Sequence, residues 1–154
     1  MAKQRTVLVT GGSRGIGASI AKHFAEQGDR IAVHYSSNGD LAKEVMASLP
    51  GSGHMTAQAD LRDADAIKVM VDSVANEFGH IDILINNAGV FFDHPIESST
   101  YEVWQKAWAD TLGVNLTGAA NVTWCALQHM PRHGDSRIVN VGSRGAFRGE
   151  PVSP

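Results

Sequence analysis

Disulfide bonds within the chain are excluded, because its 154 residues contain a single cysteine, Cys125. One cysteine also fits a reducing compartment. No apolar run reaches the roughly 18 residues that a membrane-spanning helix needs, and the first residues are too few and too polar for a secretory signal. Basic residues are not in excess either, since 13 Lys and Arg face 16 Asp and Glu. We therefore expect a cytoplasmic protein with neither a membrane nor a nucleic-acid partner.

The residues that are present suit a single globular domain. Hydrophobic residues make up 43% of the chain, which is enough for a buried core, and the net charge is only −3. A length of 154 residues is ordinary for one domain. The chain shows no internal repeat and no composition typical of a linker, so we predict one domain over residues 1–154.

Strand-like and helix-like segments alternate five times along the sequence. Short β-branched or apolar runs predict strands at 6–10, 31–35, 54–59, 81–85 and 137–141. Connections of helix length between successive strands imply parallel pairing, with helices on both faces of the sheet. We predict a doubly wound α/β fold of the Rossmann type with strand order 3-2-1-4-5, whose ligands bind at the carboxyl ends of the strands.

The last helix before the fifth strand is predicted to be long, over residues 99–130. Ser99 and Glu102 have the i, i+3 spacing of a capping box at its start. Three residues in its middle disfavour a straight helix and predict a bend: Gly113, Asn115 and Gly118. Trp104 and Trp108 lie four residues apart, as in a packing stripe along one face.

A glycine-rich turn, TGGSRGIG at Thr10–Gly17, separates the first strand from the first helix. Its glycines permit a tight turn, close approach of the backbone to a ligand and close packing of helix on strand. Unpaired N–H groups at the helix start, together with the positive end of the helix dipole, favour a pyrophosphate. No Gly-Lys-Ser/Thr follows, so the turn is not a phosphate loop of the NTPase type. We predict a dinucleotide site that includes Gly11, Ser13, Arg14, Gly15, Ile16 and Gly17.

The end of the second strand indicates which dinucleotide is preferred. An acidic residue there would bond to the ribose 2′-OH of NAD(H) and repel a 2′-phosphate. The strand instead ends in Tyr35, Ser36 and Ser37, and the first acid is Asp40. Arg14 in the glycine turn supplies a cation that can pair with a phosphate. These features favour NADP(H) over NAD(H).

Five short motifs occur along the chain: TGGSRGIG at 10–17, ADL at 59–61, NNAG at 86–89, VNLTG at 114–118 and IVNVGS at 138–143. In this order and spacing they resemble the short-chain dehydrogenase/reductase family, in its NADP-preferring reductase branch. The resemblance implies an enzyme that transfers a hydride between the nicotinamide of NADP(H) and a small ketone or secondary alcohol. It also implies that Asp60, with Leu61 beside it, contacts the adenine.

Further roles follow from the same resemblance. The stretch Asn87, Ala88 and Gly89 is expected to line the ribose and nicotinamide side of the cofactor. Asn115 resembles the family's asparagine that holds a water of the proton relay, and Ser143 resembles the serine that bonds to the substrate oxygen. His129 and His133 lie four residues apart, but no acid or cysteine completes a set of metal ligands, so we predict no metal site.

The proton donor of the family is missing from the 154 residues. In relatives it is a tyrosine followed by a lysine four positions later, about a dozen residues after the serine. Neither Tyr35 nor Tyr101 is followed by lysine at that distance. We therefore interpret the chain as the first part of a longer one-domain enzyme, truncated after its fifth strand and inactive by itself. The alternative is a non-catalytic NADP(H)-binding or interaction module. Family resemblance also suggests a homodimer or tetramer formed through the helix at 99–130.

Overall fold

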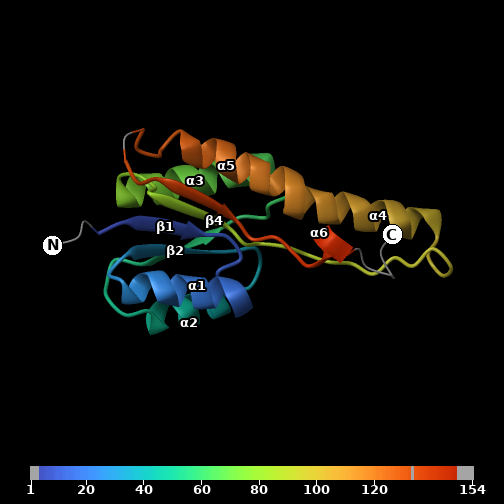
Figure 1. Ribbon diagram of the computed structural model, residues 1–154, viewed down its shortest axis with the longest axis horizontal. Coiled ribbons are helices and arrows are strands. Elements are labelled where there is room, and N and C mark those ends of the chain that lie inside the picture. Colours follow the sequence, from blue (N-terminus) through green and yellow to red (C-terminus); the bar gives the residue numbers. More distant parts are fainter. Residues whose placement is uncertain (1–3, 133, 149–154) are drawn as a thin grey trace.

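A five-stranded parallel sheet forms the centre of the computed structural model, which describes residues 4–132 and 134–148. Its strands are β1 (Thr6–Val9), β2 (Arg30–Tyr35), β3 (Met55–Gln58), β4 (Ile83–Asn86) and β5 (Arg137–Asn140). They lie in the order β3-β2-β1-β4-β5, with every neighbouring pair parallel (Figure 1). The predicted doubly wound α/β fold and its strand order are thereby confirmed.

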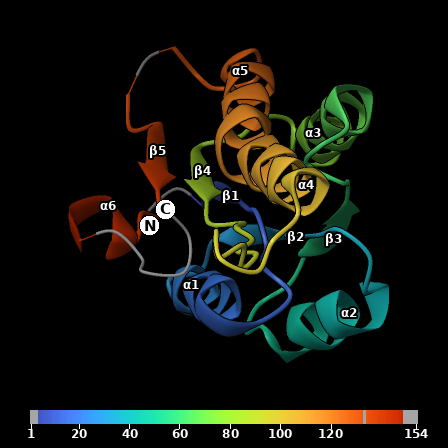
Figure 2. The same cartoon turned by 90° about the vertical axis from the view of Figure 1, so that its right-hand side faces the viewer.

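Helices cover both faces of this sheet (Figure 2). One face carries α1 (Gly15–Glu26) and α2 (Gly39–Ser48). The opposite face carries α3 (Ala64–Phe78), α4 (Tyr101–Leu112) and α5 (Ala119–Leu127). A short helix, α6 (Gly145–Arg148), follows β5 and lies beside the carboxyl end of the sheet (Figure 1).

The central strand β1 explains why the sheet has two hydrophobic cores. Val7 and Val9 pack with buried residues of α1 and α2, whereas Leu8 packs with buried residues of α3 and α5. All three side chains are fully buried. A strand covered on both faces needs a continuous apolar run rather than an alternating one, and TVLV is such a run.

The start of α4 differs from the predicted capping box. Thr100, not Ser99, caps the helix, because its hydroxyl accepts from the Val103 N–H at 3.3 Å. The N–H groups of Ser98 and Ser99 bond instead to the Pro95 carbonyl at 3.2 and 2.9 Å. These bonds hold Ser99 in a turn that precedes the helix, so the cap falls one residue later than predicted.

The predicted long helix is divided by six residues of π-helix, η1 (Gly113–Gly118). α4 precedes η1, and α5 follows it and ends at Leu127 rather than near Met130. The predicted bend is therefore a local widening of the helix, a form that is common at functional sites. Gly118 faces the end of β3, where an added Cβ would lie 2.5 Å from the Leu61 carbonyl oxygen.

Gly118→Ala should destabilise the fold by about 1–3 kcal/mol, because the new methyl group would force η1 away from Leu61. Urea unfolding followed by circular dichroism measures the change. Gly142→Ala is the matched control, since a Cβ at Gly142 meets no atom within 4 Å. Equal stability of the two variants would contradict the packing that we describe.

Within the described part of the chain, no helix is both long and apolar enough to cross a membrane.

Candidate functional site

The predicted cofactor residues line one cavity of about 490 Å³ at the carboxyl ends of the strands. The glycine turn after β1 contributes Gly11, Ser13, Arg14, Gly15, Ile16 and Gly17. The end of β2 contributes Tyr35, Ser36 and Ser37, and the segment after β3 contributes Asp60 and Leu61. The loop after β4 contributes Asn87, Ala88 and Gly89. The structure thus brings all of these residues together, and their contacts with a cofactor remain predictions.

The glycine turn is fastened to the loop after β4 through Asn87 and Thr10. The Asn87 side-chain amide donates to the carbonyls of Thr10 and Gly11 at 2.9 and 3.2 Å. The Thr10 hydroxyl accepts from the backbone N–H groups of Asn87 and Ala88, both at 3.0 Å. These bonds leave little space: a Cβ on Gly17 would lie 2.2 Å from the Gly11 carbonyl oxygen. The NNAG motif therefore shapes the turn as well as lining the cavity.

The amino end of α1 is suited to an anion. Arg14 occupies the N-cap position, and its side chain makes no capping hydrogen bond. The first turn of α1 holds no acidic residue that would compete for the N–H groups or oppose the dipole. Arg14 is exposed and lines the cavity, so a cation stands at the position where the sequence predicts a phosphate.

The adenine side of the predicted site contains two carboxylates, Asp60 and Asp110, joined by Arg62. Arg62 bonds to Asp60 at 2.6 Å and to Asp110 at 3.0 Å, and Lys106 also pairs with Asp110. Hydrogen bonds from Arg62 lower the pKa of Asp60, and those from Lys106 and then Arg62 lower the pKa of Asp110. Both acids stay ionised but carry a cationic partner, so the cavity wall does not present unpaired negative charge.

A buried histidine joins the strand ends beneath the cavity. His34 is 2% exposed, and its Nδ1 accepts from the Gly11 N–H at 3.0 Å. Its Nε2 lies 3.1 Å from the Ala59 carbonyl, an acceptor, so the proton sits on Nε2. Burial lowers the pKa of His34 to about 4 and keeps the ring neutral.

A second and wider cavity, of about 1130 Å³, continues from the first toward β5. It is lined by both predicted catalytic residues, Asn115 and Ser143, and shares Asn87, Ala88 and Gly89 with the first cavity. Ser143 is exposed, and its hydroxyl accepts from the Gly145 N–H at 3.2 Å. The Asn115 side chain bonds to both backbone groups of Val90, at 2.8 Å each. Asn115 therefore orders the loop after β4, and its predicted contact with a water remains a prediction.

Three residues of this region were not predicted from the sequence: His34, Arg62 and Asp110. His34 lies in an apolar strand, and no sequence motif around it indicates a functional role. Arg62 and Asp110 are 48 residues apart, and neither belongs to a motif. Arg62 directly follows the ADL motif, which is the one signal that could have indicated it.

No group of three or more potential metal ligands occurs within residues 4–132 and 134–148. Of the two histidines weighed for a metal, His129 bonds to Asp72 at 2.8 Å. His133 lies outside the described residues.

Comparison with known proteins identifies the family. The family model described as short chain dehydrogenase matches residues 5–154. The chain therefore belongs to the short-chain dehydrogenase/reductase family, as its motifs indicated. A crystal structure of a short-chain dehydrogenase from Burkholderia cenocepacia in complex with NADP is 37% identical with a TM-score of 0.80, over 94% of this chain and 57% of that one.

Curated relatives are oxidoreductases by name. The chain is 35% identical over 153 residues to the 3-oxoacyl-[acyl-carrier-protein] reductase FabG of Staphylococcus aureus, covering 98% of this chain and 61% of that enzyme. It is 38% identical over 144 residues to D-threitol dehydrogenase of Mycolicibacterium smegmatis, covering 92% and 54%. The chain thus spans little more than half to three fifths of the length of these relatives.

The free energy of unfolding should fall as the pH drops from about 6.5 to about 4. Over this interval His34 takes up a proton in the unfolded chain, at an ordinary pKa near 6.5, but not in the folded one, whose pKa is about 4. The loss amounts to roughly 3 kcal/mol across the interval and ceases below the folded pKa. Urea unfolding of wild type and His34→Asn at several pH values isolates this contribution. An identical pH dependence in the two proteins would show that His34 does not cause it.

Proposed function

We propose that the protein is an NADP(H)-dependent oxidoreductase that interconverts a small ketone and a secondary alcohol. The supporting observation is the cavity at the strand ends, which collects all of the cofactor residues predicted from separate motifs. The NADP complex of the Burkholderia relative, at 37% identity, adds support for the choice of cofactor.

The residues present fit such a cofactor. The uncapped amino end of α1 offers N–H groups to a diphosphate, and the glycine turn would have no room for side chains at Gly11 or Gly17. Asp60 and Leu61, which would contact the adenine, line the same cavity as Asn87, Ala88 and Gly89. Since Arg62 and Lys106 pair with Asp60 and Asp110, the cavity can accept a ligand with several negative charges.

Selectivity for the phosphorylated cofactor is assigned to Arg14 and the end of β2. Ser36 and Ser37 supply hydroxyl groups where an NAD(H)-binding protein would place an acid. Gln58 donates to the Ser36 carbonyl at 2.8 Å and so fixes this loop. Arg14, which lines the same cavity, would pair with the 2′-phosphate.

The bound cofactor supplies or accepts the hydride at the substrate carbon. On the protein side, Ser143 would bond to the substrate oxygen from the end of β5, and Asn115 would hold the loop after β4 that forms the adjoining wall. The tyrosine and lysine expected to handle the proton do not occur as Tyr-x3-Lys in the 154 residues. We therefore propose that these residues alone bind NADP(H) without turning over a carbonyl substrate.

A non-catalytic NADP(H)-binding or interaction module is the second candidate; it would use the same nucleotide cavity but would not turn over a carbonyl substrate. The mass of the purified natural protein and the sequence of its messenger RNA distinguish the enzyme from the non-catalytic module. A larger protein with a tyrosine and a lysine about a dozen residues after Ser143 supports the enzyme. A natural product of 154 residues that binds NADPH without turnover supports the module.

Replacing Arg14 with Ala should weaken NADPH binding about tenfold and NADH binding by much less, because only NADPH carries the 2′-phosphate. Fluorescence titration of both reduced nucleotides measures the two dissociation constants. Lys22→Ala is the control, since Lys22 is an exposed cation of α1 that does not line the cavity. Equal weakening of NADPH and NADH by Arg14→Ala would refute the phosphate contact.

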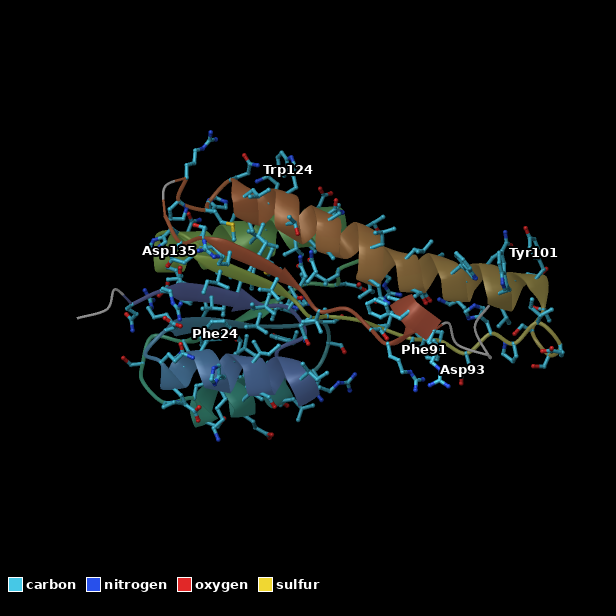
Figure 3. The ribbon with its side chains drawn as sticks, viewed as in Figure 1. Phe24, Phe91, Asp93, Tyr101, Trp124 and Asp135 are labelled. Carbon is cyan, nitrogen blue, oxygen red and sulfur yellow. The ribbon has the colours of Figure 1, made fainter. Side chains whose placement is uncertain are left out.

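We also propose that the protein forms a homodimer or tetramer through α4 and α5. Exposed apolar side chains occur along α4, η1 and α5, including Tyr101, Trp108, Leu116 and Trp124. Along α4, the rings of Tyr101 and Trp104 are stacked with centroids 6.0 Å apart, and the rings of Trp104 and Trp108 are tilted with centroids 5.4 Å apart. Trp124 points away from the sheet on the outer side of α5 (Figure 3). A face of this kind typically meets another protein surface.

Trp124→Glu should shift the assembly toward monomers, because it places a charge in the proposed contact, and sedimentation velocity measures the shift. Val69→Glu is a matched control on α3: Val69 is 70% exposed and Trp124 is 62% exposed. A wild-type protein that sediments as a monomer would contradict this assembly.

A further inference from the structure

The imidazole of His34 stands at the junction of three strand ends. Its Nδ1 accepts from Gly11, the first glycine of the turn after β1, at 3.0 Å. Its Nε2 donates to Ala59, the residue after β3 and before Asp60, at 3.1 Å. Its own backbone carbonyl accepts from the Gly12 N–H at 2.8 Å. One buried residue of β2 therefore connects the glycine turn to the segment that carries Asp60.

The position of Gly11 matters because the start of α1 is packed against it. The Gly11 carbonyl oxygen lies so close to Gly17 that an added Cβ would be only 2.2 Å away. The same carbonyl accepts from the Asn87 side chain at 3.2 Å. A displacement of Gly11 would therefore move the amino end of α1 and the loop after β4, which are two walls of the cavity.

The wall of the cavity that contains Asp60 is held in place through Nε2 of His34. Ala59 is fully buried, and its N–H bonds to the Tyr35 carbonyl at 3.1 Å while its carbonyl accepts from His34. Asp60 follows directly and lines the cavity with its carboxylate held by Arg62. His34 thus sets the spacing between the amino end of α1 and the residue expected to contact the adenine.

We infer that His34 is a positioning residue of the nucleotide site, which holds the glycine turn in its binding conformation through the Gly11 N–H. This inference rests on the proposed NADP(H)-binding function. His34 lines the cavity, but its two ring nitrogens are both engaged with backbone groups, so neither is available to bond to the nucleotide. What it contributes is preorganisation, since the turn does not have to be ordered when the ligand arrives.

A second histidine provides a control with the same chemistry in another place. His54 Nδ1 accepts from the Ile31 N–H at 3.1 Å, and its Nε2 lies 3.0 Å from the Pro50 carbonyl. It too joins backbone groups of neighbouring segments, but at the amino end of β2, and it does not line the nucleotide cavity. Loss of its contacts should affect stability without affecting nucleotide affinity.

Two amide side chains separate the functions of the two ring nitrogens. The Asn side-chain oxygen stands at about the distance of Nδ1 from the backbone, whereas the Gln side-chain nitrogen stands at about the distance of Nε2. His34→Asn can therefore keep the acceptor for Gly11, and His34→Gln can keep the donor to Ala59. His54→Gln is the corresponding control variant.

The test measures NADP⁺ dissociation constants by calorimetry and stability by urea unfolding for wild type and these three variants. We expect His34→Gln to weaken NADP⁺ binding about tenfold, the effect of one lost hydrogen bond in a buried site, and His34→Asn to stay within about threefold of wild type. His54→Gln should lose stability while keeping the wild-type dissociation constant. Separation of affinity from stability distinguishes positioning from a general structural role.

Each other outcome overturns the inference. If His34→Gln and His34→Asn both bind NADP⁺ like wild type, or both weaken equally, the Gly11 contact does not set affinity, and the proposed function stands. If wild type itself does not bind NADP⁺, the proposed function fails and the inference with it. If His34→Gln does not fold, amide hydrogen exchange of wild type decides: we expect the Gly11 N–H to be protected before NADP⁺ is added. Protection that appears only with NADP⁺ would overturn the inference.

Discussion

The close approach of the glycine turn to the loop after β4 is the constraint on which the candidate site depends. The Gly11 carbonyl oxygen touches Gly17 and accepts from Asn87, and a Cβ at Gly11 would lie 2.9 Å from the Ala88 Cα. Backbone can pack on backbone in this way only where side chains are absent. Because of this packing, the turn stays rigid and the N–H groups at the start of α1 face an open cavity at the edge of the sheet.

The acidic side chains that line the cavity are paired with basic ones. The carboxylates near the predicted adenine position, Asp60 and Asp110, share Arg62, and Lys106 pairs with Asp110 from the preceding turn of α4. These groups are partly exposed, so the ion pairs add little to stability. Their effect is on the field that a ligand meets, because an anion entering the cavity finds paired acids and the positive end of α1.

The sequence predicted the fold well because the alternation of strand-like and helix-like segments is strong and the connections between strands are of helix length. It predicted which residues line the first cavity because they lie in local motifs at strand ends. It could not predict the His34 contacts with Gly11 and Ala59, since a lone histidine in an apolar strand does not indicate its partners. The Arg62–Asp110 pair depends on how α4 crosses the end of β3, which local patterns do not specify.

The errors at the long helix have the same physical origin. Ser99 and Thr100 are both good N-caps, and the choice is made by turn bonds to Pro95 that spacing alone does not reveal. Glycine and asparagine in mid-helix indicated a bend, but the π-helical form of η1 reflects tertiary contact. Gly118 must pass against Leu61 while Asn115 bonds to Val90.

Through those contacts η1 supports two parts of the site, the segment after β3 and the loop after β4. Through Gly118 it supports the segment that carries Asp60, and through Asn115 it holds the loop between β4 and α4. The flanking helices carry exposed aromatic residues, from Tyr101 on α4 to Trp124 on α5 (Figure 3). A partner bound to these residues would hold the axis of α4 and α5, and with it the two contacts of η1. Assembly and the geometry of the nucleotide cavity would then be linked through the packing of η1, and the partner would also border the second cavity, which Leu116 and Trp124 line.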